Sequence, residues 1–96
     1  MNDRSDAIEE LGRIRDRIEQ LDQQLIGVLA QRIELARRVG ELKRRASLPT
    51  LDPPREAAVV RRAGALAREA GVDDEDIRYV FWQIIGMSRR AQLEER

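Results

Sequence analysis

The chain has neither cysteine nor histidine among its 96 residues. Without thiols and imidazoles it has no disulfide, no catalytic thiol, no imidazole base and no zinc site of the usual Cys/His type. Any chemistry must therefore be carried by Arg, Lys, Asp, Glu, Ser, Gln or backbone groups.

An excess of charge of one sign is also absent, because eighteen basic residues balance eighteen acidic ones. Proteins that bind nucleic acids usually show a basic excess or patch, so this balance argues against such a partner. No apolar run approaches the ~20 residues of a membrane span, and the N-terminal MNDRSDAIEE lacks an apolar signal core. We therefore expect a cytoplasmic protein whose partners include neither nucleic acid nor a membrane.

Helix-forming sequence is abundant, with 42% apolar and 38% charged residues. Ser5 or Asp6 can cap a first helix, Gly71 can end a second, and Asp73 or Asp74 can cap a third. Two consecutive prolines favour the start of the second helix. The patterns predict one all-α domain over residues 1–96, with helices at about 6–45, 53–70 and 74–94.

The first predicted helix carries a heptad stripe of apolar residues that one cation interrupts. The stripe consists of Leu11, Ile14, Ile18, Leu21, Leu25, Val28, Leu35, Val39 and Leu42. Arg32 occupies a position where a leucine would continue the pattern. Burying an unpaired guanidinium costs several kcal/mol. Arg32 therefore needs an anion, which is either a protein carboxylate or a ligand.

The length of this helix predicts a dimer. A helix of 40 residues is about 60 Å long, whereas a compact domain of this size has a radius of gyration near ~13 Å. The two shorter helices cannot cover the whole apolar stripe alone. We therefore expect two long helices to share one bundle.

Other polar residues lie on or beside the apolar stripes. Lys43 follows Arg32 by three helical turns on nearly the same face, with Cα atoms about 16 Å apart, so both head groups can meet one small dianion. Ser88 and Gln92 interrupt the stripe of the third helix at positions i and i+4. Arg15 lies about 25 Å from Arg32 along the helix. It can reach that position only from an antiparallel partner helix.

Each of these residues also has a purely structural interpretation. Arg32 can form an interhelical salt bridge or fix the register of a bundle. Lys43 can be a charge at a helix end. Asp52 can be a cap, while Arg55 and Glu56 are ordinary residues for a first turn. Ser88 and Gln92 can be hydrogen-bonding residues within a bundle. The joint pattern is more informative than any single residue.

That joint pattern resembles the all-helical class of chorismate mutases. The matching segments read LGRIRDRIEQLDQQLIGVLAQRIELARRVGELK, LDPPREAAVV and YVFWQIIGMSRRAQ, and together they extend over about residues 10–93. The resemblance implies an intertwined homodimer of chains with one very long and two shorter helices. It also implies a shikimate-pathway enzyme that rearranges chorismate to prephenate in phenylalanine and tyrosine biosynthesis, without a metal or a cofactor.

The resemblance assigns roles to eight positions of this chain. It implies that Arg15, from the neighbouring subunit, and Arg32 hold the substrate carboxylates. Lys43 contacts a carboxylate and the ether oxygen, and Gln92 also donates to that oxygen. Glu56 accepts a hydrogen bond from the ring hydroxyl. The remaining positions are Asp52 and Arg55, which belong to the DxxRE motif, and Ser88, which lies near a carboxylate or hydroxyl.

Two other functions stay open at this point. Isochorismate–pyruvate lyases share this fold and a similar basic site, although the DPPRE segment and Ser88 favour a mutase. A non-enzymatic helical dimerisation module would give Arg32, Lys43 and Gln92 protein partners and would lack a deep anion site. The resemblance also leaves open a partner enzyme from the shikimate pathway.

Overall fold

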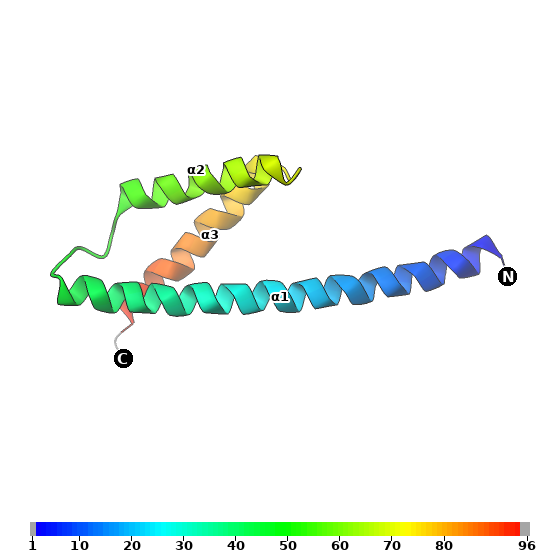
Figure 1. Ribbon diagram of the computed structural model, residues 1–96, viewed down its shortest axis with the longest axis horizontal. Helices are drawn as coiled ribbons and strands as arrows, with labels where there is room; N and C mark the ends of the chain where they lie inside the picture. Colours follow the sequence, from blue (N-terminus) through cyan, green and yellow to red (C-terminus); the bar gives the residue numbers. More distant parts are fainter. Residues whose placement is uncertain (1, 95–96) are drawn as a thin grey trace. The chain divides into compact units, whose positions relative to one another are not determined.

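The computed structural model describes residues 2–94 and contains three α-helices (Figure 1). They are α1 (Asp3–Arg45), α2 (Pro53–Glu69) and α3 (Asp74–Leu93). No strand occurs in this part of the chain, so the predicted all-α class with three helices is confirmed. The first helix begins earlier than expected, because the Asn2 side chain accepts a hydrogen bond from the Ser5 amide at 2.8 Å. Asn2, rather than Ser5 or Asp6, caps that end.

Local signals fix the ends of the two shorter helices. The Asp52 carboxylate accepts a hydrogen bond from the Arg55 amide at 3.2 Å, and the Asp73 carboxylate accepts one from the Asp76 amide at 2.9 Å. Gly71 follows α2 with a φ of 74°, a left-handed conformation that glycine adopts without strain. The start of α2, which carries several of the predicted site residues, is therefore fixed by its own cap.

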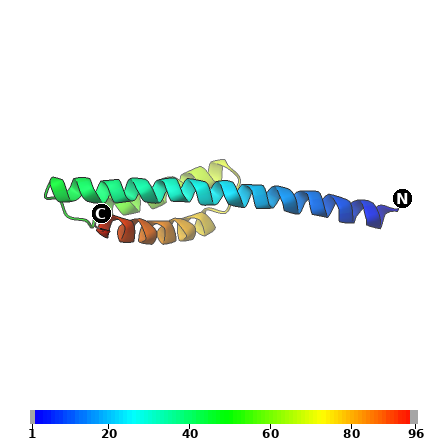
Figure 2. The same cartoon turned by 90° about the horizontal axis from the view of Figure 1, so that it is seen from below.

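The chain divides into two compact units, one ending at Gln31 and the other beginning at Arg32. In the second unit, α3 leads from the C-terminal end of α2 back to the C-terminal part of α1 (Figures 1 and 2). Its core contains Val59, Val60 and Ile85, with Phe81 packed against them. The buried small residues on the helix faces are Ala63, Gly64, Ala67 and Ala91. Small side chains let α2 and α3 pack closely.

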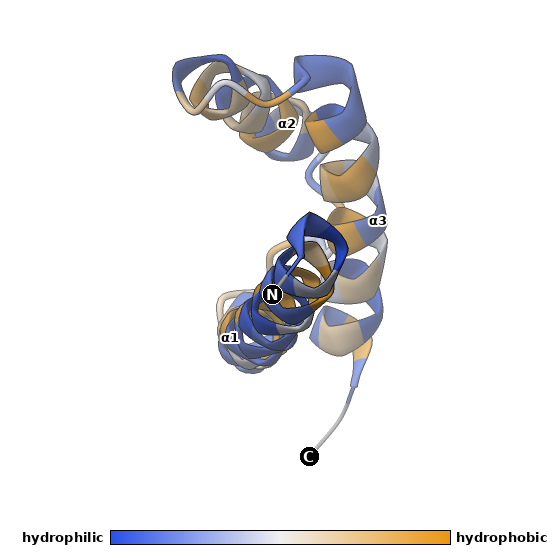
Figure 3. Cartoon of the chain, turned by 90° about the vertical axis from the view of Figure 1, so that its right-hand side faces the viewer, coloured by the Kyte–Doolittle hydropathy of each residue, from blue (hydrophilic) through white to orange (hydrophobic). Residues whose placement is uncertain are grey.

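The first unit is a helical segment whose apolar residues are exposed in the single chain. Their exposed fractions range from 44% at Leu11 to 64% at Ile26. The exposed set is Ile8, Leu11, Ile14, Ile18, Leu21, Leu25, Ile26 and Val28. Figure 3 shows both hydrophobic and hydrophilic residues on α1. Because most helical stability in proteins comes from packing an apolar face, this stripe is available for burial against another surface. None of the described helices contains an apolar stretch long enough to cross a membrane.

In the second unit, α1 and α3 come into close contact at Gly40. A Cβ atom at this position would collide with the backbone of Gln92, lying only 2.7 Å from its Cα. The Arg44 guanidinium then donates to the Gln92 carbonyl at 2.8 Å and to the Glu94 carbonyl at 3.3 Å. The glycine and the arginine together fix the C-terminal end of α3 against α1.

We expect Gly40→Ala to destabilise the protein by about 1–3 kcal/mol, because the added methyl group must push α3 away from α1. Gly12→Ala is the matched control, since a Cβ there meets nothing within 4 Å. In that open position alanine should be neutral or stabilising by up to ~1 kcal/mol. Urea unfolding of both variants measures the difference. A Gly40→Ala variant as stable as the parent chain would contradict the close approach.

Candidate functional site

A cavity of about 420 Å³ lies in the second unit, between the C-terminal part of α1, the start of α2 and the second half of α3. This volume is within the range of ligand pockets, roughly 300–1,000 Å³. The polar residues that line it are Arg32, Lys43, Asp52, Arg55, Glu56, Ser88 and Gln92. The structure thus brings together seven of the eight predicted site residues. Arg15 does not line the cavity and is exposed on α1.

Arg32 has a neutral partner. Its guanidinium donates to the Ser88 hydroxyl, which in turn donates to the Ile84 carbonyl at 3.0 Å. Burial lowers the pKa of Arg32, and repulsion by the like charges of Arg62 and Arg55 lowers it further. A hydroxyl cannot neutralise a guanidinium, so the positive charge in the apolar stripe stays uncompensated and favours the entry of an anion.

Lys43 and Gln92 are joined in the same cavity. The Lys43 ammonium donates to the Gln92 side-chain oxygen and to the Thr50 carbonyl, both at 2.8 Å. Because the amide oxygen of Gln92 already accepts from Lys43, its NH₂ group remains as a donor. The salt bridges formed within residues 2–94 include neither Arg32 nor Lys43. Both cations are therefore held in place by neutral oxygen atoms.

Glu56 differs from these residues, because its charge has a direct partner. Arg89 donates to both carboxylate oxygens, from Nε at 2.7 Å and from Nη2 at 2.5 Å. These hydrogen bonds lower the pKa of Glu56 against the opposing effect of burial, and the charges of Arg89 and Lys43 add to the lowering. Glu56 is therefore an ionised hydrogen-bond acceptor at the cavity wall.

Asp52 serves two purposes in the structure. Its carboxylate caps α2, which is the structural interpretation that the sequence allowed, and the same residue lines the cavity. The apolar part of the wall consists of Leu35, Ala36, Val39, Val59 and Ile85. Apolar walls lower the local dielectric, so each charge in the cavity acts more strongly on a ligand than it would in water.

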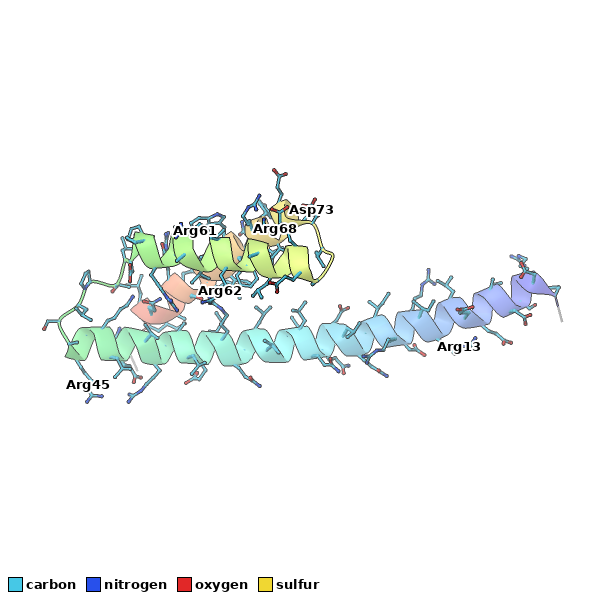
Figure 4. All side chains as sticks on the ribbon, turned by 45° about the horizontal axis from the view of Figure 1, so that its top comes forward. Arg13, Arg45, Arg61, Arg62, Arg68 and Asp73 are labelled. Carbon is cyan, nitrogen blue, oxygen red and sulfur yellow. The ribbon has the colours of Figure 1, made fainter. Side chains whose placement is uncertain are left out.

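Sequence reasoning missed two arginines, Arg62 and Arg89. Figure 4 shows Arg62 on the side of α2 that faces α1, whereas Arg61 lies on the opposite side. The spacing of seven residues between Arg55 and Arg62 is a signal that they share a helix face. No sequence signal marks the pairing of Arg89 with Glu56, which lies 33 residues away.

The cavity therefore contains two cations hydrogen-bonded to neutral oxygen atoms (Arg32 and Lys43), the amide NH₂ donor of Gln92 and the ionised carboxylate of Glu56. Such a set can bind a small dianion and can stabilise negative charge that develops on an oxygen atom. Among residues 2–94, no group of three or more acidic side chains is placed to hold a metal ion.

Comparison with known proteins gives a consistent result. Residues 14–93 match the family described as chorismate mutase type II. A chorismate mutase from Methanocaldococcus jannaschii is 36% identical over 78 residues, which cover 81% of this chain and 78% of the relative. A T-protein from Enterobacter agglomerans is 36% identical over 88 residues, covering 92% of this chain but 24% of its own length. A conserved hypothetical protein from Pyrococcus furiosus has a similar structure, with a TM-score of 0.72, 32% identity and coverage of 86% of this chain and 95% of its own.

We expect Arg32→Leu to keep or raise the midpoint of unfolding. Leucine extends the apolar stripe and removes a cation that its neighbours repel, while the Ser88 hydroxyl keeps its hydrogen bond to the Ile84 carbonyl. Arg61→Leu, which removes an exposed cation on the far side of α2, is the control for lost charge. A loss of several kcal/mol in Arg32→Leu alone would instead identify Arg32 as a structural ion-pair residue.

Proposed function

This chain belongs to the chorismate mutase type II family, and from that membership we propose that its cavity binds chorismate and promotes its rearrangement to prephenate. In this reaction one ether C–O bond breaks and one C–C bond forms within a single molecule. No nucleophile or proton transfer is needed, so a chain without His or Cys can perform it. The proposal rests on one observation: the charged groups of Arg32 and Lys43 donate hydrogen bonds to neutral oxygen atoms and so remain able to bind an anionic ligand.

The two cations suit a substrate with two carboxylates. When the ligand enters, Arg32 exchanges the neutral Ser88 hydroxyl for a carboxylate, which can accept two parallel hydrogen bonds from the guanidinium. Lys43 contacts a carboxylate and the ether oxygen, and the second carboxylate is held by Arg15 of the partner subunit. Holding a flexible dianion by both ends favours the chair-like conformation in which the reacting carbon atoms meet.

The transition state is stabilised at the ether oxygen. Negative charge builds on that oxygen as the C–O bond breaks, and it is met by the Lys43 ammonium and the Gln92 NH₂ group. The hydrogen bond between Lys43 and Gln92 aligns the two donors before the substrate arrives. Preorganised donors in a partly buried site are effective because they need not reorient during the reaction.

Glu56, in this proposal, accepts a hydrogen bond from the ring hydroxyl and so orients the ring. The Glu56 carboxylate lines the cavity, and because it is ionised it can only accept hydrogen bonds. The remaining proposed substrate-binding residues are Asp52, Arg55 and Ser88.

We also propose that the whole chain forms one domain of an intertwined homodimer. The exposed apolar stripe of residues 3–31 supports this, because it needs a partner surface. The sequence spacing predicts about 25 Å of helix between Arg15 and Arg32, so in this proposal Arg15 enters the site of the other subunit rather than its own. Two equivalent sites would then each contain Arg15 of the partner subunit, bound to the second carboxylate.

The direct test is an assay of the purified chain with chorismate, in which the loss of chorismate absorbance is followed and the product is identified. Prephenate as the product supports the mutase. Release of pyruvate from isochorismate would support the lyase alternative. No turnover of either compound by a folded dimer would favour the dimerisation module.

Subunit mixing tests the shared site. Arg15→Ala and Arg32→Ala homodimers should each be inactive, since every site lacks one carboxylate ligand. In a mixed dimer, one site carries both substitutions and the other carries neither, so up to about half of the activity per heterodimer should return. Subunit exchange must be demonstrated separately, for example by mass spectrometry of intact dimers. Complete exchange without recovered activity would exclude Arg15 from the partner site.

A pH profile tests Gln92. The amide does not titrate, so no carboxyl proton at this position limits activity near neutral pH. Gln92→Glu must be protonated to donate, because an ionised carboxylate repels the substrate and the developing oxyanion. The variant should work best at acid pH and lose activity as pH rises. The measurement is kcat/KM from about pH 4 to about pH 9, with dimer integrity checked at each end. Equal activity at both extremes would remove Gln92 from the ether-oxygen role.

A further inference from the structure

We propose that Arg89 is a positioning and specificity-determining residue, which orients the Glu56 carboxylate from outside the cavity and makes it select a neutral ring hydroxyl over a cationic ring substituent. This inference rests on the proposed function, in which Glu56 accepts a hydrogen bond from the ring hydroxyl. Arg89 itself does not line the cavity and therefore acts only through Glu56.

The geometry separates the two residues clearly. The Glu56 side chain is 13% exposed and lines the cavity, whereas the Arg89 side chain is 44% exposed on α3. Two hydrogen bonds, from Nε and Nη2 to the two carboxylate oxygens, fix the plane of the carboxylate. Each carboxylate oxygen has a further lone pair, so Glu56 can still accept a hydrogen bond from a ligand.

Arg89 also controls what else Glu56 can bind. Lys43 already acts electrostatically on Glu56 across the cavity. Without Arg89, the Glu56 carboxylate would lose its ion-pair partner and would attract the Lys43 ammonium more strongly. An ion pair between them would draw Lys43 away from Gln92 and from the substrate. The bidentate pair outside the cavity therefore keeps both Glu56 and Lys43 available for a ligand.

The charge balance gives the specificity. A carboxylate that is paired with a guanidinium attracts a further cation only weakly, because the net charge of the pair is small. The same carboxylate can still accept a hydrogen bond from a neutral hydroxyl. An aliphatic amine is protonated at neutral pH. In place of the ring hydroxyl it would meet Glu56 beside the cations Arg89 and Lys43, and like charges placed close together are unfavourable. The site should therefore prefer the hydroxyl compound over its amine analogue.

The test compares R89M with R90M, which removes a neighbouring exposed cation that does not line the cavity. R89M should lose roughly 10–100-fold in kcat/KM for chorismate at pH 7, with circular dichroism confirming the fold. Removing Arg89 raises the pKa of Glu56, and the ionised form of Glu56 is the acceptor. When the pH is lowered, R89M should therefore lose activity at a higher pH than the parent chain does.

R89K keeps the positive charge but cannot donate two parallel hydrogen bonds to the carboxylate. The pH at which R89K loses activity on acidification should therefore stay near that of the parent chain, while its kcat falls. R90M should match the parent chain.

Selectivity and a binding-independent readout complete the test. The ratio of kcat/KM for the amine analogue to that for chorismate should rise roughly tenfold or more in R89M and stay unchanged in R90M. Carboxyl-carbon NMR of Glu56 should show a higher titration midpoint in R89M, whether or not the chain is active. Failure of the parent chain to convert chorismate counts against the proposed function alone. An active parent chain with an unchanged acid limb, Glu56 titration and selectivity in R89M overturns the role of Arg89. If R89M does not fold, an R89K variant identical to the parent chain in kcat and selectivity overturns it.

Discussion

The uncompensated charge of Arg32 is the constraint on which the rest of the site depends. A guanidinium that is partly buried in an apolar stripe is stabilised when an anion meets it, and here its side-chain partner is only a hydroxyl. Lys43 repeats the pattern with two carbonyl oxygens. Within residues 2–94 the fold holds both cations in place without a salt bridge, so a dianionic ligand can form charge-assisted hydrogen bonds with both of them.

The position of Gln92 depends on backbone packing rather than on charge. Gly40 lets α3 approach α1 so closely that a methyl group would not fit, and Arg44 holds the carbonyl of the same glutamine. Lys43, three residues after Gly40, then reaches the Gln92 side chain. One contact between the helices therefore sets the geometry of the two groups that we propose act on the ether oxygen.

Much of the fold and the site could be predicted from the sequence, because the decisive signals are local. The break in the heptad pattern identified Arg32, which lines the cavity, and capping chemistry located both ends of α2 and the start of α3. The pairing of Glu56 with Arg89 could not be predicted, since it depends on how two helices are rotated about their axes. The contact of Gly40 with Gln92 has the same origin. Helical periodicity defines a face but not the point at which two helices cross.

The most direct test of the uncompensated-charge hypothesis is a crystal structure of the protein bound to a bicyclic dicarboxylate that mimics the chair-like transition state. The hypothesis predicts that Arg32 leaves the Ser88 hydroxyl for one carboxylate, with Arg15 of the partner subunit on the other and Lys43 and Gln92 beside the ether oxygen. A ligand bound elsewhere, with Arg32 still on Ser88 and Lys43 paired with Glu56, would contradict it.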